Sequence, residues 1–179
     1  MPDISKVTGN SYEDGALAGA ELIQLFGEIG EFASNALTGN LKTKLDIEKM
    51  LHSIWRGGGN PDPAVVGFLQ TVMRSKDYDA SIVAIWGHDN FIENQTKWGP
   101  ICELPDERDV FQFGFWTGDI ADGDGWCYDM ADGMIRCVPV SVAPETCDQL
   151  RQGSYAVYDS FHYLVAHLRC SARKRGWIK

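Results

Sequence analysis

The chain lacks the motifs that mark the commonest catalytic, metal-binding and membrane proteins. It has no Gly-x-Ser-x-Gly elbow and no Walker loop, and Gly57–Gly59 has no lysine with which to cradle a phosphate. Its five cysteines form no Cys-x-x-Cys pair, so neither a zinc knuckle nor a redox motif is present. No apolar run is long enough to cross a bilayer, and Met1–Ser5 lacks the basic start of a secretory signal. We therefore expect a cytoplasmic protein with no membrane association, no cofactor and no bound metal.

The cysteines are expected to be reduced. Cys127 and Cys137 flank a turn, which is compatible with a cross-strand disulfide, but the total of five is odd. Buried free thiols are the favoured interpretation.

Basic residues are scarce in most of the chain. Residues 1–168 carry 11 basic against 25 acidic residues, whereas the last eleven positions carry five basic residues and no acid. An acidic body repels phosphate backbones and attracts basic proteins, so we expect a protein partner and no nucleic acid. The basic end suits the C-terminus of a helix, where cations complement the macrodipole.

Four helices are predicted from apolar residues spaced three and four apart. The first begins after Ser11 and ends near Gly39, with a break favoured by its internal glycines. The second is capped by Asp46, the third begins at Asp62-Pro63, and the last begins at Asp159 or Ser160.

Four strands are predicted between the third and the last helix, at 82–86, 110–116, 126–130 and 134–140. Asp132-Gly133 is typical of a two-residue hairpin turn. Helices, then a run of strands, then a helix indicate an α+β fold with a mostly antiparallel sheet covered on one face. The length suits a single compact domain, in which we divide an N-terminal helical extension (1–44) from an α+β domain (45–179).

The segment 118–135 contains four glycines and five aspartates around a short aromatic run. Carboxylates of this density suggest calcium, but an EF-hand register places Ile120 at the first ligand position and Ala131 at the position of the bidentate glutamate. The segment is therefore interpreted as an acidic turn followed by a hairpin.

No catalytic residues are assigned. His88 could act as an acid or a base near the aspartates, which leaves a metal-dependent hydrolase as an alternative, but no nucleophile is marked as its partner. His162 and His167 are five apart on a helix and do not form a same-face metal pair.

An exposed tryptophan flanked by carboxylates has the composition of a hot spot for a basic partner. If Phe111, Phe113 and Phe115 face the core, strict alternation turns Trp116 outward, next to the acidic turn. Packing of Trp116 under a loop is the alternative. The predicted partner-binding residues are Trp116, Asp119, Asp122, Asp124, Trp126 and Asp129.

Three segments in order resemble a known family. The hairpin 123–135 is similar to the glycine-rich acidic turn and strand of the SUKH superfamily of immunity-protein-like domains, which includes Syd. The segment 61–69 is similar to that family's proline-led helix, and 158–164 to its closing helix. The usual Asn-Gly after the proline-led helix is replaced by Met73–Lys76, and residues 1–40 have no counterpart.

The resemblance implies an α+β domain that binds a protein and has no active site. Many members of that family are antidotes that neutralise a toxin, so the expected function is that of an immunity or antitoxin-like protein that occludes a basic toxin domain. A regulatory adaptor without a toxin is a further alternative, because a fold does not fix a function.

Overall fold

The structure is a computed structural model that describes residues 11–30, 39–54, 61–76, 78–79, 83–85, 87–97, 110–116, 124–138, 147–154 and 156–179. Its helices are α1 (Tyr12–Ile29), α3 (Lys44–Ile54), α4 (Pro63–Val72), α5 (His88–Lys97), α6 (Cys147–Gln152) and α7 (Phe161–Lys174). Its strands are β1 (Tyr78–Asp79), β2 (Val83–Ile85), β3 (Val110–Trp116), β4 (Asp124–Asp129), β5 (Met134–Val138) and β6 (Ala156–Tyr158).

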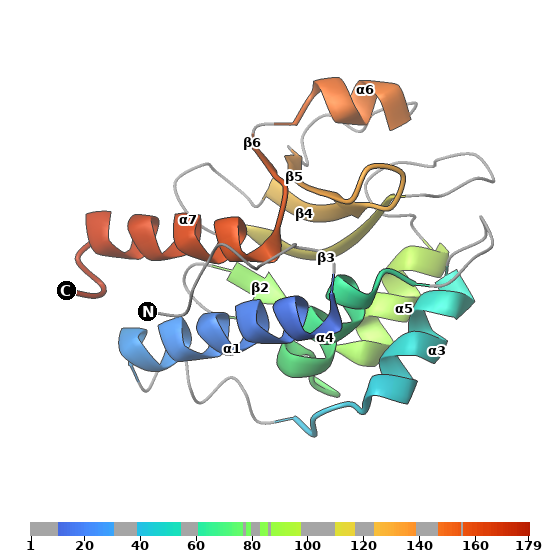
Figure 1. The fold of residues 1–179 in the computed structure, drawn as a ribbon, viewed down its shortest axis with the longest axis horizontal. Coiled ribbons are helices and arrows are strands. Elements are labelled where there is room, and N and C mark those ends of the chain that lie inside the picture. Colours follow the sequence, from blue (N-terminus) through green and yellow to red (C-terminus); the bar gives the residue numbers. More distant parts are fainter. Residues whose placement is uncertain are drawn as a thin grey trace.

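The strands form one sheet in the order β1-β2-β3-β4-β5-β6, in which each strand is antiparallel to its neighbours. The order in space is therefore the order in the sequence. N-terminal helices, this sheet and a closing helix make up the α+β fold (Figure 1), as the sequence predicts.

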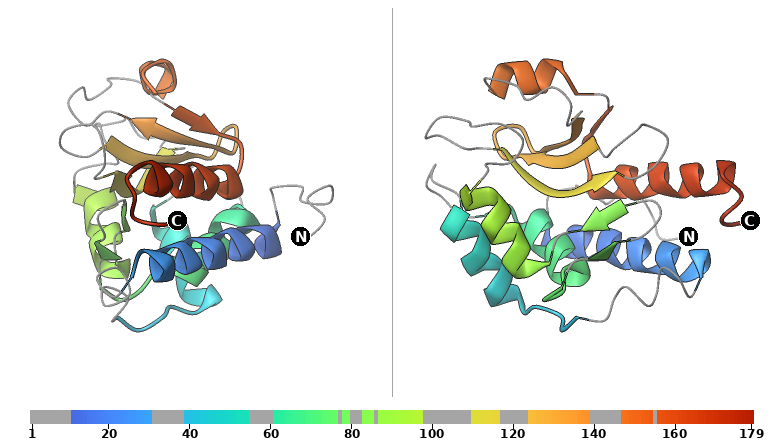
Figure 2. Two further views of the ribbon diagram at one scale, coloured as in Figure 1. Left: turned by 90° about the vertical axis from the view of Figure 1, so that its left-hand side faces the viewer. Right: turned by 180° about the vertical axis from the view of Figure 1, so that it is seen from behind.

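The main core lies on the face of the sheet that α1, α4 and α7 cover (Figure 2). The ring of Phe161 at the start of α7 stacks on Phe68 of α4, with centroids 4.1 Å apart. The Phe161 ring is also parallel to within 4° to that of Tyr128 of β4, with centroids 5.9 Å apart. This aromatic column joins both helices to the middle of the sheet.

The opposite face is partly covered as well, which adds to the predicted architecture. Helix α6 lies on the side of the sheet away from the other helices (Figure 1), and its Leu150 packs into a small buried cluster with Val110, Cys127 and Val138. Strand β4 is therefore buried on both faces.

Helices α1 and α4 cross with their backbones in close contact at two glycines. A β-carbon at Gly15 would lie 2.7 Å from the carbonyl carbon of Ala64 and closer still to its oxygen. A β-carbon at Gly67 would lie 2.9 Å from the backbone nitrogen of Ala16 and closer still to the carbonyl oxygen of Tyr12. Only glycine permits this separation at either position.

Helix α1 belongs to the common core. Its Leu22, Leu25 and Phe26 are at most 1% exposed and lie in the same cluster as the aromatic column. The Ser11 hydroxyl caps the helix by accepting from the amide of Asp14 at 3.1 Å, as predicted. The helix has its C-cap at Gly30, whose φ of 115° favours glycine. The predicted continuation to near Gly39 falls on residues 31–38, which lie outside the described residues.

The other helix starts show which capping signals the sequence analysis identified. Asp62 caps α4 and Ser160 caps α7, both as predicted. The cap of α3 is Thr43 and not Asp46: the Thr43 hydroxyl accepts from the Asp46 amide at 3.2 Å, while the Asp46 carboxylate accepts from the Thr43 amide at 3.0 Å. This reciprocal pair is a capping box. Helices α5 and α6 and strands β1 and β6 were not predicted.

The turn between β4 and β5 is longer than predicted. Asp129 pairs with Met134, so the loop has four residues instead of two, and Gly133 takes the left-handed conformation with φ of 71°. Cys127 and Cys137 are buried free thiols. Cys127 pairs with Arg136 and Cys137 with Trp126 in the ladder, so the two cysteines are not opposite each other and lie in different clusters.

Within the described residues, no helix combines the length and the apolar character that a bilayer crossing requires.

Candidate functional site

The loop end of the β3–β4 hairpin, where Trp116 and Asp124 lie, brings two of the predicted partner-binding residues together. Trp116 is the last residue of β3 and pairs directly with Asp124, the first residue of β4. The connection between them carries Asp119 and Asp122, which lie outside the described residues. Strand β3 thus contributes an aromatic residue and strand β4 an acidic residue at the same end of the sheet.

A bulge changes the expected orientation of β3. The ladder shifts between Gln112 and Gly114, so Phe113 is the extra residue, and Phe111 and Phe113 both belong to the main core. The extra residue moves the alternation along β3 by one position. Trp116 therefore has the same place in the alternation as Gly114. The prediction that Trp116 alternates to the face opposite the phenylalanines rested on unbroken alternation, which the bulge removes.

Trp126 is not a surface residue. Its side chain is 1% exposed, on the face that carries the aromatic column, and its ring lies 5.9 Å from that of Tyr158. The sequence prediction that it contributes to a partner-binding surface is therefore corrected. Trp126 lies two residues before Tyr128, so alternation along β4 places both residues on the face that packs in the main core.

Asp129 is also buried, at 0% exposure, and is held by two arginines. Arg151 of α6 donates from Nε at 2.7 Å and from Nη2 at 3.1 Å, and Arg136 of β5 donates from Nε at 3.4 Å. The backbone amide of Ala131 donates to the same carboxylate at 3.1 Å. A carboxylate satisfied in this way is structural, which corrects its assignment as a contact residue.

The two arginines extend this network to the surface. Arg136 also pairs with Asp132 in the hairpin loop, and Arg151 reaches Asp148 one turn earlier in α6 at 3.4 Å. The network fastens α6 to the β4–β5 hairpin. Its three aspartates face two guanidinium groups, so most of the charge of the network is paired internally.

A second polar link connects the sheet to the helices. The Tyr128 hydroxyl donates to Asp62 Oδ2 at 2.5 Å, and the other carboxylate oxygen of Asp62 accepts from the amide of Ala64 at 2.9 Å. Burial, followed by the neighbouring Asp62 carboxylate, raises the pKa of Tyr128 far above its ordinary value. The sequence marks Asp62 as a helix cap but gives no sign of its partner in β4.

His88 lies away from the loop end of the β3–β4 hairpin. It is the first residue of α5, which follows β2. In the ladder β2 passes from Val83, opposite Trp116, to Ile85, opposite Gly114, so the chain leaves the Asp124 end before it reaches His88. The His88 ring contacts Asp89 at 2.9 Å, and this hydrogen bond lowers the pKa of the Asp89 carboxyl.

In the described part of the chain, no three His, Cys, Asp or Glu side chains are grouped so that they could hold a metal ion. Asp119 and Asp122 lie outside that part of the chain.

No family model, curated protein or solved structure matches this chain. The site is therefore defined by its own geometry.

Proposed function

We propose that this chain binds a basic protein through the loop end of the β3–β4 hairpin, and that the partner is a toxin domain that it neutralises by occlusion. The observation that carries the proposal is the direct pairing of Trp116 with Asp124. It places an aromatic residue next to the acidic connection that holds Asp119 and Asp122, and this composition is typical of a hot spot.

The charge of the whole chain supports a basic partner. The arginine network uses three aspartates and two arginines of residues 1–168. The remainder of that segment still carries 22 acidic against 9 basic residues. Internal pairing at the network therefore does not account for the acidic excess, which would accelerate encounter with a positively charged surface.

Occlusion requires no chemistry from this protein. A basic nuclease-like toxin has a positive cleft for phosphate groups, and carboxylates from the hairpin end would occupy that cleft in place of the nucleic acid. The resemblance of segments 61–69, 123–135 and 158–164 to the SUKH superfamily selects a toxin among the possible basic partners. The aspartate cluster and His88 suit a hydrolase less well, because the ladder separates His88 from Asp124.

Capture followed by a neutralisation assay tests the proposal. The immobilised chain is used to capture proteins from cells that carry its gene, and the captured protein is then expressed alone and together with the chain. We expect a basic protein that arrests growth alone and is harmless in the presence of the chain. A captured protein that is harmless by itself would favour the adaptor, and a stoichiometric metal with a large loss of stability on chelation would favour the hydrolase.

A further inference from the structure

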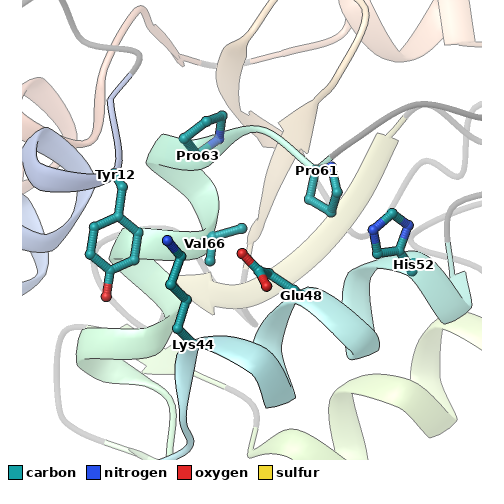
Figure 3. Close-up of a pocket in the computed structure, with 7 residues that line it drawn as sticks. All are labelled: Tyr12, Lys44, Glu48, His52, Pro61, Pro63 and Val66. Atoms are coloured by element: carbon teal, nitrogen blue, oxygen red, sulfur yellow. The ribbon is translucent and has the colours of Figure 1, made fainter.

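The starts of α1 and α4 and one face of α3 surround a pocket of about 320 Å³ (Figure 3). This volume lies at the lower end of the range of small-molecule sites. The pocket is lined by Tyr12, Lys44, Glu48, His52, Pro61, Pro63 and Val66. None of these residues belongs to the hairpin end or to the arginine network.

One wall of the pocket is fixed by a chain of hydrogen bonds. The Tyr12 hydroxyl donates to Gln70 Oε1 of α4 at 3.0 Å, and Gln70 Nε2 donates to the carbonyl oxygen of Lys42 at 3.4 Å. Gln70 therefore holds the tyrosine hydroxyl and is itself tied to the segment before α3. A wall positioned in this way is organised before any ligand arrives.

The opposite wall is fixed as firmly. Pro61 and Pro63 flank Asp62, whose two carboxylate oxygens accept from Tyr128 and from the amide of Ala64. The proline rings add rigidity because they restrict the backbone. Val66 of α4 is buried and supplies an apolar surface between the walls.

Two opposite charges face this space without neutralising each other. Lys44 and Glu48 are one turn apart on α3 and point toward Val66 (Figure 3). The Lys44 ammonium lies over the Tyr12 ring, 4.5 Å from its centroid. No ion pair joins Lys44 to Glu48 where the chain is described. The lysine is also the first residue of α3, where the helix dipole disfavours a cation and a bound anion would relieve it.

We infer that this pocket binds a small α-amino acid with an apolar side chain. The carboxylate of the ligand meets Lys44, its ammonium group meets Glu48, and its side chain packs among Tyr12, the two prolines and Val66. The two charged groups of an α-amino acid are on one carbon atom, so a single ligand can meet charges one helical turn apart. Rigid walls favour such a ligand over a flexible one.

Calorimetric titration with L-leucine, L-proline and L-phenylalanine tests the inference. We expect at least one of them to bind with a dissociation constant of about 1 mM or lower, which is the scale of a few well-placed contacts. N-acetylation of that amino acid removes its ammonium group, and amidation removes its carboxylate. Each change is expected to weaken binding about tenfold, the scale of one charge-assisted contact.

Variants of α3 assign the binding to this pocket. Lys44→Met and Glu48→Gln should each weaken binding about tenfold while leaving the melting temperature nearly unchanged, because both residues are partly or fully exposed. Lys49→Met is the matched control, since Lys49 is exposed on the same helix and does not line the pocket. The inference is overturned if none of the three amino acids binds, if blocked and unblocked ligands bind equally, or if Lys49→Met weakens binding as much as Lys44→Met.

Discussion

The α1–α4 crossing gives the most exacting test of the fold. Replacing Gly15 or Gly67 by alanine places a methyl group against backbone atoms of the other helix, at 2.7 Å from the Ala64 carbonyl carbon in the first case and 2.9 Å from the Ala16 nitrogen in the second. Backbone atoms cannot rotate away as a side chain can, so the two helices must separate. Their separation loosens the packing of core residues such as Phe68, which is 0% exposed.

The magnitude follows from two opposing effects. Alanine in place of a helical glycine stabilises a helix by about 0.5–1 kcal/mol. Overpacking a core costs about 1–3 kcal/mol, and a clash with backbone lies at the upper end of that range. We therefore expect Gly67→Ala and Gly15→Ala each to lower the free energy of unfolding by about 2 kcal/mol, and the melting temperature by about 4–8 °C.

Gly27→Ala is the matched control. Gly27 lies in the same helix as Gly15, and a β-carbon there would have nothing within 4 Å. This variant should be more stable than the unchanged protein by about 0.5–1 kcal/mol. Urea denaturation followed by circular dichroism measures all three, with an unchanged m-value as the check that the unfolded state is the same.

The double variant Gly15→Ala/Gly67→Ala tests the geometry further. Once the helices have separated for one methyl group, the second meets less resistance, so the double variant should lose less than the sum of the two single losses. Equal stability of Gly15→Ala and Gly27→Ala would refute the close crossing.

Three further predictions concern the sheet. Asp129→Asn should lower the free energy of unfolding by about 3 kcal/mol because it leaves two arginines without their shared carboxylate. The Asp148 side chain is 85% exposed, so Asp148→Asn should change the free energy of unfolding by less than about 0.5 kcal/mol. Equal losses in the two variants would contradict the network. Burial and Asp62 raise the pKa of Tyr128 above its ordinary 10.0, so above that pH the unfolded chain holds fewer protons and stability must fall with rising pH. Between pH 10 and 12 the free energy of unfolding should fall with rising pH, and Tyr128→Phe should reduce this slope by up to about 1.4 kcal/mol per pH unit. Tyr158, whose pKa burial raises to about 12, contributes separately to the slope. A thiol reagent should label the exposed Cys170 in the folded protein and Cys127 and Cys137 only after unfolding, and mass spectrometry of the labelled peptides would contradict this assignment if all three react together.

The sequence predicts the elements whose signals are local. Asp62-Pro63 and Ser11 start helices as expected because each cap needs only the next few residues. Helix α5 was missed because its ten residues include only two large apolar side chains, Phe91 and Ile92. Strand β6 is three residues long and has too little alternation to recognise.

The candidate site is only partly accessible to sequence reasoning, for a physical reason. Consecutive strands joined by a short connection pair as a hairpin, with the adjoining ends opposite each other, which accounts for the pairing of Trp116 with Asp124. The acidic segment that joins the two strands was recognised in the sequence. Trp126 is buried in the main core, on the face of β4 away from α6. The burial of Asp129 depends on α6, whose Leu150 and Arg151 cover the second face of β4 from more than twenty residues away. Alternation along one strand contains no information about such a cover.

The central claim is that acidic groups at the β3–β4 end steer a basic partner. The most direct measurement is the association rate of the captured partner at several salt concentrations, with the unchanged chain, with Asp119→Asn/Asp122→Asn/Asp124→Asn, and with the control Glu13→Gln/Asp148→Asn/Asp159→Asn. The control alters net charge equally at exposed acids elsewhere. We predict that the hairpin variant lowers the association rate at low salt by about tenfold and flattens its salt dependence, while the control changes it less than about twofold. Equal effects of the two variants, or no effect of either, would contradict the account.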